Sequence, residues 1–339
     1  EFLWQEGHTA HATAEEAVER TQMMLDVYTR MAEDYLAMPV IRGKKTAAER
    51  FPGAIDTLCI EAMMQDRKAL QAGTSHFLGQ NFSKASGIKF QTADEKEEFA
   101  WTTSWGTSTR LIGGVIMNHG DDDGIILPPR VASSHIVLMP IFRKPEEKTA
   151  VMEFVEALGK ELSEQRYGNA KLRVEIDSRD IGGARNWEWV KKGIPVRAEI
   201  GPRDIAENAV FMARRDRGVR DKESVPRDRF VSSISEILDD IQKNLFERAK
   251  KHMEENSVAL DDRKAFYDYF TPESASQPEI HGGFSYSHWC GSGECENKIK
   301  DDLSVTIRCI PLKDEHGDEG SCVCCGRRSK RRVVFAKAY

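Results

Sequence analysis

The sequence predicts a multidomain protein of mixed α+β and α/β class, and three observations support this. Its 339 residues exceed what a single hydrophobic core usually sustains. The apolar pattern changes near residue 134, where a strand-rich block gives way to alternating strands and helices. Six of the seven cysteines follow residue 289, which marks a distinct final region. We therefore expect domains at residues 1–133, 134–227 and 228–339.

The first region predicts a strand, a helix and then a strand-rich block. Glu1–Glu6 is typical of a buried strand, and Thr13 with Glu16 three residues later predicts a capping box at the start of a helix. Met38–Arg42 is a strand candidate, and residues 55–130 form the strand-rich block. The apolar face of the helix is expected to contain Val18, Leu25, Tyr28, Met31 and Tyr35.

The second region alternates strands with helices. Helices are expected around the apolar positions of residues 151–162 and at Trp187–Lys192. Strands are expected at Ile136–Ile141, Leu172–Ile176, Pro195–Ile200 and Asn208–Arg214. This order predicts a compact α/β domain with a largely parallel or mixed sheet.

The third region begins near Asp228 with one long helix. Its apolar positions form a single stripe, which indicates core packing: Ile234, Ile237, Leu238, Ile241, Leu245 and Ala249. The cysteine-rich tail comes after this helix.

The tail holds two cysteine pairs with metal-site spacing, Cys290-x4-Cys295 and Cys322-x2-Cys325. Short loops deliver thiolate ligands in pairs, so the pattern predicts a structural zinc site with four protein ligands. No secretory signal is recognisable, which favours metal binding over disulfides. Cys324 could replace one ligand, and Cys309 is expected to be packed in the core.

Composition and charge exclude other classes of protein. No apolar run approaches the roughly 20 residues that a membrane helix needs. The net charge of −6 argues against a nonspecific nucleic-acid coat, which would be basic throughout. The basic runs at residues 214–217 and 327–332 are either local basic surfaces or solvated loops.

Two short motifs are each weak alone. Gln71–His76 is a polar segment that a plain loop could also supply. Ser104–Arg110, followed by Gly113 and Gly114, combines small residues that let a nucleotide approach with an arginine that can pair with a phosphate. A glycine-rich turn before a core helix would look similar.

Taken together, long strings across the chain resemble the prolyl-tRNA synthetase family of class II aminoacyl-tRNA synthetases. The strings are EFLWQEGHTAHAT, QAGTSHFLGQNFSKASGIKFQ, TSWGTSTRLIGG, HGDDDGIILPPR, GIPVRAEIGPRD and the terminal VVFAKAY. The resemblance covers essentially the whole chain. It implies an antiparallel catalytic sheet flanked by helices, present in part, then an α/β anticodon-binding domain and a small α/β zinc-binding domain.

The resemblance also implies the activity, which is activation of L-proline with ATP followed by transfer of proline to tRNA-Pro. Arg110 would be the catalytic arginine of motif 3, on the terminal phosphate. ATP would be bound by Gln71, Thr74, Ser108 and Arg110. Proline would be bound by His76, Trp4, Glu6 and His8. Mg²⁺ is expected with ATP, but the sequence does not name its ligands, and Asp121–Asp123 reads more readily as a solvated turn.

In the anticodon-binding domain the expected recognition residues are Glu188, Lys192, Arg197, Glu199 and Arg203, with Trp187 and Trp189 nearby. Arg197 and Glu199 could instead form an ion pair on a strand surface. The final residues, ending in Tyr339, are expected to fold back toward the active site. A homodimer in the cytoplasm is expected, with structural Zn²⁺.

Two departures matter. Motif 1 and the first strand of motif 2 are not in the sequence, so we expect this segment alone to be inactive. Only 57 residues separate Thr13 from Gln71, which leaves no room for a large editing domain. The chain therefore resembles the archaeal and eukaryotic-like type.

A non-catalytic synthetase-like tRNA-binding or regulatory protein is the alternative function. A zinc-ribbon adaptor would explain only the tail.

Overall fold

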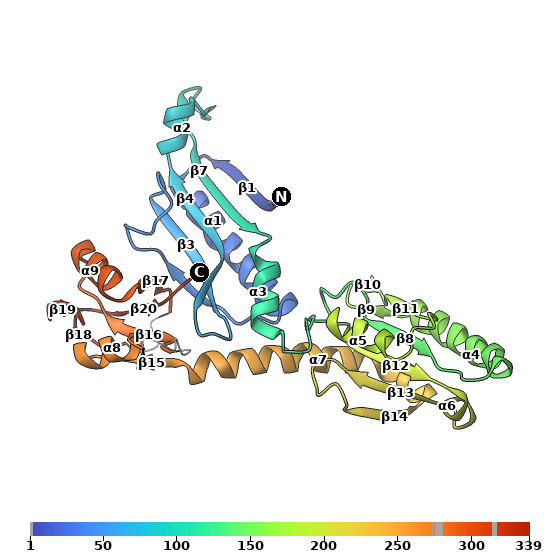
Figure 1. Ribbon diagram of the computed structural model, residues 1–339. Coiled ribbons are helices and arrows are strands. Elements are labelled where there is room, and N and C mark those ends of the chain that lie inside the picture. Colours follow the sequence, from blue (N-terminus) through green and yellow to red (C-terminus); the bar gives the residue numbers. More distant parts are fainter. Residues whose placement is uncertain (1–2, 273, 275–280, 314–316) are drawn as a thin grey trace. The chain divides into compact units, whose positions relative to one another are not determined.

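The computed structural model describes residues 3–272, 274, 281–313 and 317–339 and folds into two compact units (Figure 1). The first unit combines the chain up to Asp34 with Met38–Asn118 and Lys250–Tyr339. The second unit contains Tyr35–Ala37 and His119–Ala249. Glu1 and Phe2, at the start of the first predicted strand, lie outside the described residues.

A nine-stranded sheet is the centre of the first unit in the described part of the chain. Neighbouring strands are antiparallel except for the last pair. In spatial order they are β1 (Trp4–His11), β7 (Trp101–Ser108), β4 (Ala69–Gly79), β3 (Asp56–Met63), β2 (Ile41–Lys44), β17 (Thr306–Pro311), β20 (Arg332–Ala336), β16 (Phe284–His288) and β15 (Ser257–Ala259). The pairing of β2 with β17 joins early and late parts of the chain in one sheet.

Helix α1 (Ala14–Arg30) packs against β4 and β7 (Figure 1). Thr13 caps it as predicted, accepting a hydrogen bond from the Glu16 N–H, but the Glu16 carboxylate accepts from Ala12 instead of Thr13. The buried face is Ala17, Thr21, Leu25 and Tyr28. The prediction was wrong for Val18 and Tyr35, which are exposed. A π-helical turn at Met31–Tyr35 changes the helical phase before Tyr35 is reached.

The remaining elements of the first unit surround this sheet. Helices α8 and α9 pack on the late strands through an apolar cluster that includes Phe266, Phe270, Ile299 and Phe335. These elements are α2 (Asn81–Ser86), α3 (Arg110–His119), α8 (Arg263–Phe270), α9 (Gly293–Leu303) and the short strands β5 (Lys89–Gln91), β6 (Glu97–Phe99), β18 (Gly320–Ser321) and β19 (Arg328–Ser329).

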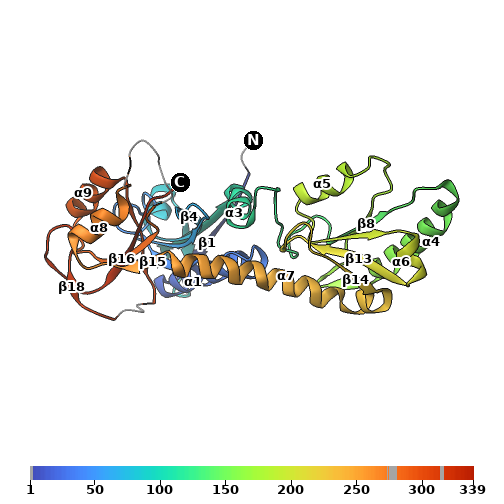
Figure 2. The same ribbon diagram turned by 60° about the horizontal axis from the view of Figure 1, so that its bottom comes forward.

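The second unit contains a five-stranded mixed sheet with the order β11-β8-β12-β13-β14, which confirms the α/β prediction. β8 is parallel to β11 and β12, whereas β12, β13 and β14 are antiparallel. The strands of this sheet are β8 (Ile136–Pro140), β11 (Val174–Ile176), β12 (Val196–Ile200), β13 (Ala209–Arg214) and β14 (Lys222–Pro226). The short strands β9 (Arg166–Tyr167) and β10 (Ala170–Lys171) pair separately with each other. The helices are α4 (Pro145–Glu164), α5 (Ala184–Lys191) and α6 (Pro202–Ala206), all visible in Figure 2.

The long helix α7 (Arg227–Glu255) confirms the predicted apolar stripe. Ile234, Leu238, Ile241, Leu245 and Ala249 are buried, and Ile237 is partly buried against the same core. The helix belongs to the second unit up to Ala249. None of the described helices combines the length and the apolarity that crossing a bilayer requires.

The acidic run Asp121–Asp123 and the basic run at residues 214–217 are joined by ion pairs in the second unit. Arg215 is buried and donates two hydrogen bonds to the carboxylate of Asp121, of 2.7 and 2.5 Å. That carboxylate also accepts the N–H groups of Asp123 and Gly124. Arg214 donates to the carboxylate of Asp216 at 3.0 and 2.8 Å. Asp121 therefore closes a structural turn, and the two arginines do not form a basic surface.

Candidate active site and thiolate cluster

A cleft of about 740 Å³ opens on the first unit, over β1, β7 and β4. Its volume lies within the range of small-molecule sites. All eight residues predicted to bind ATP or proline line it: Trp4, Glu6, His8, Gln71, Thr74, His76, Ser108 and Arg110. Residues as far apart in the sequence as Trp4 and Arg110 therefore share one cavity.

The register of the three strands explains why these residues meet. Glu6 lies opposite Gly106, which lies opposite Thr74. Two positions further along β1, His8 lies opposite Ser104, which lies opposite His76. Since alternate residues of a strand face the same side, both rungs point into the cleft.

Gln71 reaches the same side because β4 contains a register irregularity. Ile60 of β3 pairs with Gly73, but the next residue, Glu61, pairs with Gln71. The extra residue, Ala72, changes the alternation by one position, which is the effect of a β-bulge. Gln71 and Thr74 therefore share a face although their spacing is odd.

Arg110 stands at the open end of the cleft, where β7 passes into α3. It is the first residue of α3 and is exposed. Its backbone N–H donates to the Ser108 hydroxyl at 3.3 Å, and its guanidinium donates to the Gln71 carbonyl at 3.4 Å. An exposed guanidinium held in this way retains donors for a phosphate.

His76 marks the other, enclosed end of the cleft. It is 8% exposed, and burial lowers its pKa to about 4, so the imidazole is neutral at pH 7. Its Nδ1 is hydrogen-bonded to the Thr57 hydroxyl at 2.9 Å. The ring of Phe51 lies 4.8 Å from the imidazole, centroid to centroid.

The outer strand β1 supplies a carboxylate and an aromatic side chain. Glu6 lies 3.7 Å from Nε2 of His8. Trp4 is 66% exposed and lines the cleft. A carboxylate near an aromatic wall is suited to a small ligand that carries an ammonium group.

Several lining residues were missed from the sequence. Lys45, Arg50, Phe51, Thr57 and Trp105 also line the cleft. Thr57 could have been inferred from the alternation along the strand Asp56–Met63, because it lies opposite His76. Residues 45–51 lie between β2 and β3 and form neither a helix nor a strand. No periodic pattern in the sequence therefore identified them as cleft residues.

The last residues of the chain dock beside β4. The Tyr339 N–H donates to the Ala69 carbonyl at 3.3 Å, and the Tyr339 hydroxyl donates to the Asp66 carboxylate at 2.5 Å. Ala338 forms a bridge with Ala69. The end of the chain is thereby attached to β4 at Ala69, which is two residues before the cleft residue Gln71.

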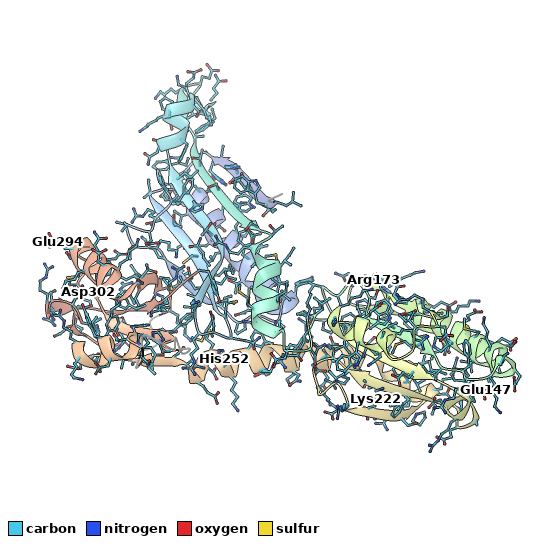
Figure 3. All side chains as sticks on the ribbon, in the orientation of Figure 1. Glu147, Arg173, Lys222, His252, Glu294 and Asp302 are labelled. Atoms are coloured by element: carbon cyan, nitrogen blue, oxygen red, sulfur yellow. The ribbon has the colours of Figure 1, made fainter. Side chains whose placement is uncertain are left out.

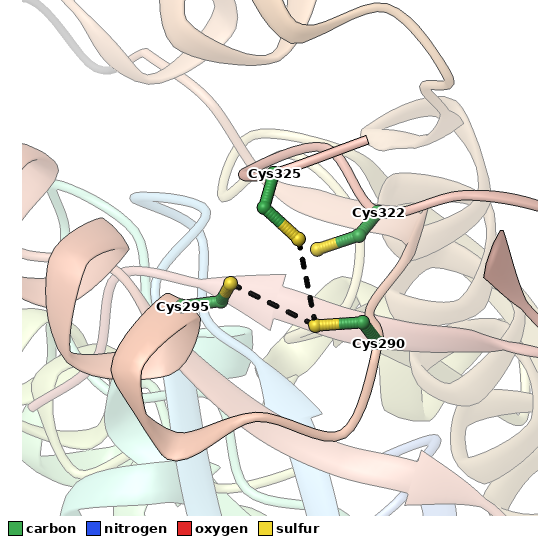
Figure 4. Close-up of side chains that lie close together, drawn as sticks. All are labelled: Cys290, Cys295, Cys322 and Cys325. Carbon is green, nitrogen blue, oxygen red and sulfur yellow. Dashed lines mark hydrogen bonds between the residues drawn. The ribbon is translucent and has the colours of Figure 1, made fainter. Parts of the chain in front are cut away.

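The four cysteines predicted to bind metal come together at one point (Figure 4). Cys290 follows β16, Cys295 lies on α9, and Cys322 and Cys325 lie between β18 and β19. Their sulfurs are all within 4.8 Å of one another, with Cys290 3.7 Å from both Cys295 and Cys325.

The cluster fits zinc. A tetrahedral Zn²⁺ with Zn–S bonds near 2.3 Å separates its sulfurs by about 3.8 Å. Arg327 lowers the pKa of the Cys325 thiol to about 6, which favours the thiolate that a metal binds. Cys324 packs in the apolar cluster of α8 and α9, and Cys309 is fully buried in a neighbouring cluster.

Four of the five predicted anticodon-binding residues lie on one side of the second sheet. Glu188 and Lys192 belong to α5 and its C-terminal cap. Arg197 and Glu199 alternate with residues of β12 that pack toward α4, so they face α5. Arg203 does not join them, because it lies on α6, whose Ile205 packs in the α4-side core.

Three of the five predicted residues already have ionic partners, and Arg203 pairs with Glu207 at 3.1 Å. Glu188 accepts a hydrogen bond from Arg179 at 2.8 Å. Glu199 accepts one from Lys222 at 2.8 Å, and Figure 3 shows Lys222 on β14. The ion pair considered for Glu199 and Arg197 is therefore replaced by a pair with Lys222.

Arg197 is unusual among the described arginines of this unit. It is 1% exposed, and its Nε donates to the Asn186 side chain at 3.2 Å. Neither of its two Nη atoms has a hydrogen-bond partner in the described structure. Burial, with the like charge of Arg215, lowers its pKa to about 10. Both Nη groups are thus buried without a hydrogen-bond partner in the described structure.

Comparisons with known proteins agree with this geometry. The model of the prolyl-tRNA synthetase C-terminal domain matches residues 276–339, and that of the anticodon binding domain matches residues 135–237. The proline–tRNA ligase 2 of Anaeromyxobacter dehalogenans is 54% identical over 344 residues, covering 100% of this chain and 67% of that protein. The proline–tRNA ligase of Bdellovibrio bacteriovorus is 52% identical with the same coverage.

A solved structure supports the same assignment. The prolyl-tRNA synthetase of Cryptosporidium parvum, complexed with L-proline and AMP, superposes with a TM-score of 0.88 at 34% identity. The match covers 100% of this chain and 68% of that one. With a shared cleft, a four-thiolate cluster and relatives about half identical over two thirds of their length, this chain belongs to the prolyl-tRNA synthetase family.

Proposed function

We propose that this chain carries the ATP- and proline-binding cleft and the anticodon-binding surface of a proline–tRNA ligase. The observation that carries the proposal is the meeting of Gln71, Thr74 and His76 with Ser108 and Arg110 in one cleft. Curated relatives that are about half identical are proline–tRNA ligases, and the Cryptosporidium parvum enzyme was solved with L-proline and AMP.

The nucleotide would occupy the open end of the cleft. Gln71, Thr74 and Ser108 would contact ATP, and the Arg110 guanidinium would meet its terminal phosphate. During activation an oxygen of the proline carboxylate attacks the α-phosphorus and the bond to the β-phosphate breaks. Negative charge then builds up on the departing pyrophosphate, where a prearranged cation lowers the barrier.

Proline would occupy the enclosed end. His76 is neutral there and held by Thr57, so its imidazole can hydrogen-bond without adding charge. Glu6 would face the secondary ammonium, and Trp4 and His8 would complete the wall. In the second step a hydroxyl of the terminal tRNA ribose attacks the prolyl carbonyl and AMP leaves.

Two metal ions accompany this assignment. Cys290, Cys295, Cys322 and Cys325 would hold structural Zn²⁺, because their sulfurs match its geometry and leave no open position. Mg²⁺ is expected with ATP, where it neutralises phosphate charge. Its ligands are unassigned. The Asp121 carboxylate is not a candidate, because it accepts hydrogen bonds from Arg215.

We assign anticodon contacts to the α5 side of the second sheet. Arg197 carries donors of the kind that fork onto a guanine edge, and Glu188, Lys192 and Glu199 lie on the same side of the sheet. Arg203 is proposed as a separate contact to the tRNA, because it lies on α6 and not on the α5 side of the sheet. The homodimer and the cytoplasmic location are proposed from the family resemblance.

The test is pyrophosphate exchange with the full-length enzyme and a panel of all amino acids. Exchange should require proline. Arg110→Ala should raise the activation barrier by about 2–4 kcal/mol, as loss of a charge-stabilising donor does. Arg179→Ala, which changes an arginine in the second unit, is the matched control and should leave exchange intact. Unchanged exchange in Arg110→Ala would remove it from the mechanism, and no exchange with any amino acid would indicate a non-catalytic relative.

A further inference from the structure

One wall of the cleft is the segment between β2 and β3, residues 45–52, which we call the wall segment. Five of its residues line the cleft: Lys45, Glu49, Arg50, Phe51 and Pro52. It consists of turns and contains no helix or strand. A backbone bond from the Lys45 N–H to the Thr57 carbonyl, at 2.8 Å, holds its start, and side-chain contacts position the rest.

The first contact joins the wall segment to the helix that carries a zinc ligand. The Thr46 hydroxyl donates to the Glu296 carboxylate at 2.7 Å and accepts the Glu49 N–H at 3.3 Å. Thr46 and Glu296 are both buried. Glu296 follows Cys295 on α9, so one hydroxyl binds the turn of the wall segment to the thiolate cluster's own helix.

The second contact is a buried group of three charges. The Lys45 ammonium donates to the Glu61 carboxylate at 2.7 Å and to the Arg308 carbonyl at 2.8 Å. The Arg308 guanidinium donates to the same carboxylate at 3.1 and 3.0 Å. Glu61 is fully buried, so its bonds face no competition from water. Arg308 lies on β17, in the late part of the chain.

The far end of the wall segment reaches the enclosed end of the cleft. The Phe51 N–H donates to the Thr57 hydroxyl at 3.2 Å, and Thr57 is itself bonded to His76. The Phe51 ring covers the imidazole. A displaced wall segment would therefore disturb His76 first, whereas Arg110 is held separately by Ser108 and Gln71.

We propose that Lys45 and Thr46 are positioning residues for the amino acid. Through Glu296 and Arg308, the zinc-bearing part of the chain holds the wall segment so that Phe51 covers His76. The assignment of this end to proline rests on the proposed function. The zinc-bearing part then affects amino-acid binding, in addition to stabilising its own fold.

The test is Thr46→Val in the full-length enzyme, a change of equal size that removes only the hydroxyl. The KM for proline should rise between about 3- and 30-fold, the range set by one buried hydrogen bond, while the KM for ATP and kcat stay within about twofold. Zinc content should remain unchanged. Hydrogen exchange of backbone amides in residues 45–52 should quicken.

Variants of Glu296 separate positioning from general destabilisation. Glu296→Ala should reproduce the effect of Thr46→Val, whereas Glu296→Gln retains an oxygen acceptor for Thr46 and should restore a nearly normal KM for proline. Lys298→Ala is the matched control on α9. It breaks only the exposed pair with Asp302, labelled in Figure 3, and should change neither KM.

Three results would overturn the inference. They are an unchanged KM for proline in folded, zinc-loaded Thr46→Val, an equal rise in both KM values, or unchanged amide exchange in residues 45–52. In each case proline-dependent exchange by the unmodified enzyme would leave the proposed function intact. If the unmodified enzyme showed no exchange, the proposed function would fail, and amide exchange alone would decide whether Thr46 holds the wall segment.

Discussion

The buried guanidinium of Arg197 should destabilise the second unit and contribute to tRNA binding. Its removal should therefore raise the free energy of unfolding and lower the affinity for tRNA-Pro. The perturbation is Arg197→Met, which keeps an unbranched apolar side chain of similar length. Burial holds the pKa of Arg197 at about 10 in the folded protein, well below the ordinary value of an arginine. Because this base is harder to protonate when folded, the cost grows as the pH falls from the ordinary arginine pKa to about 10, and it is fully present at every lower pH, including pH 7.

The pKa difference corresponds to about 3 kcal/mol of destabilisation. Methionine removes that cost but also loses the hydrogen bond to Asn186, which is worth about 1 kcal/mol. The free energy of unfolding of the second unit should therefore rise by about 1–2 kcal/mol. The affinity for tRNA-Pro should fall about tenfold or more, since two base-directed donors are lost.

Arg215→Met is the matched control in the same unit. Arg215 is also buried, but it donates to Asp121 and to the carbonyls of Val190 and Gly124. Removing this partnered charge should destabilise the unit by about 3–5 kcal/mol. Unfolding can be measured through hydrogen exchange of β12 and β13 in urea, and affinity by filter binding at fixed salt. A loss of stability in Arg197→Met comparable to that in Arg215→Met would refute the reasoning.

Two further predictions concern zinc and pH. Cys290→Ser should reduce bound zinc from one per chain to a small fraction, whereas Cys324→Ser should retain it, as measured by atomic emission; retained zinc in Cys290→Ser would contradict the ligand set. Burial lowers the pKa of His119 to about 4, so stability should decline as the pH falls from about 6.5 to 4, where the unfolded chain binds a proton that the folded chain does not. His119→Gln should reduce the slope of unfolding free energy against pH by about one proton, and an unchanged slope would exclude His119 as its source.

Local patterns predicted the elements whose cause is local. The stripe of α7 and the alternation of β12 depend on a helical or a strand period, and both are present in the structure. The cysteine spacing is also a local signal, because the two members of each pair are only a few residues apart in the sequence. That Glu6 and Thr74 line one cleft was predicted only through the family resemblance, and the register that aligns them through Gly106 was not predicted.

Contacts between distant parts of the chain could not be predicted in this way. The bonds of Thr46 with Glu296 and of Glu61 with Arg308 join residues about 250 positions apart. Nothing near Thr46 in the sequence distinguishes it from a threonine in a plain loop. Arg197 was named as a ligand contact, but its burial and its missing partners depend on the packing of α5 against β12.

The pairing of β2 with β17 also bears on synthesis of the protein. Lys44 pairs with Ile310, so the ribosome must add 266 residues (310 − 44) before that edge of β2 is covered. At roughly 5–20 residues per second this takes about 15–50 s. Uncovered strand edges invite aggregation, and shortness and cationic side chains discourage it. β2 has four residues, two of them Arg42 and Lys44, and is thereby protected while the nascent chain waits for its neighbour.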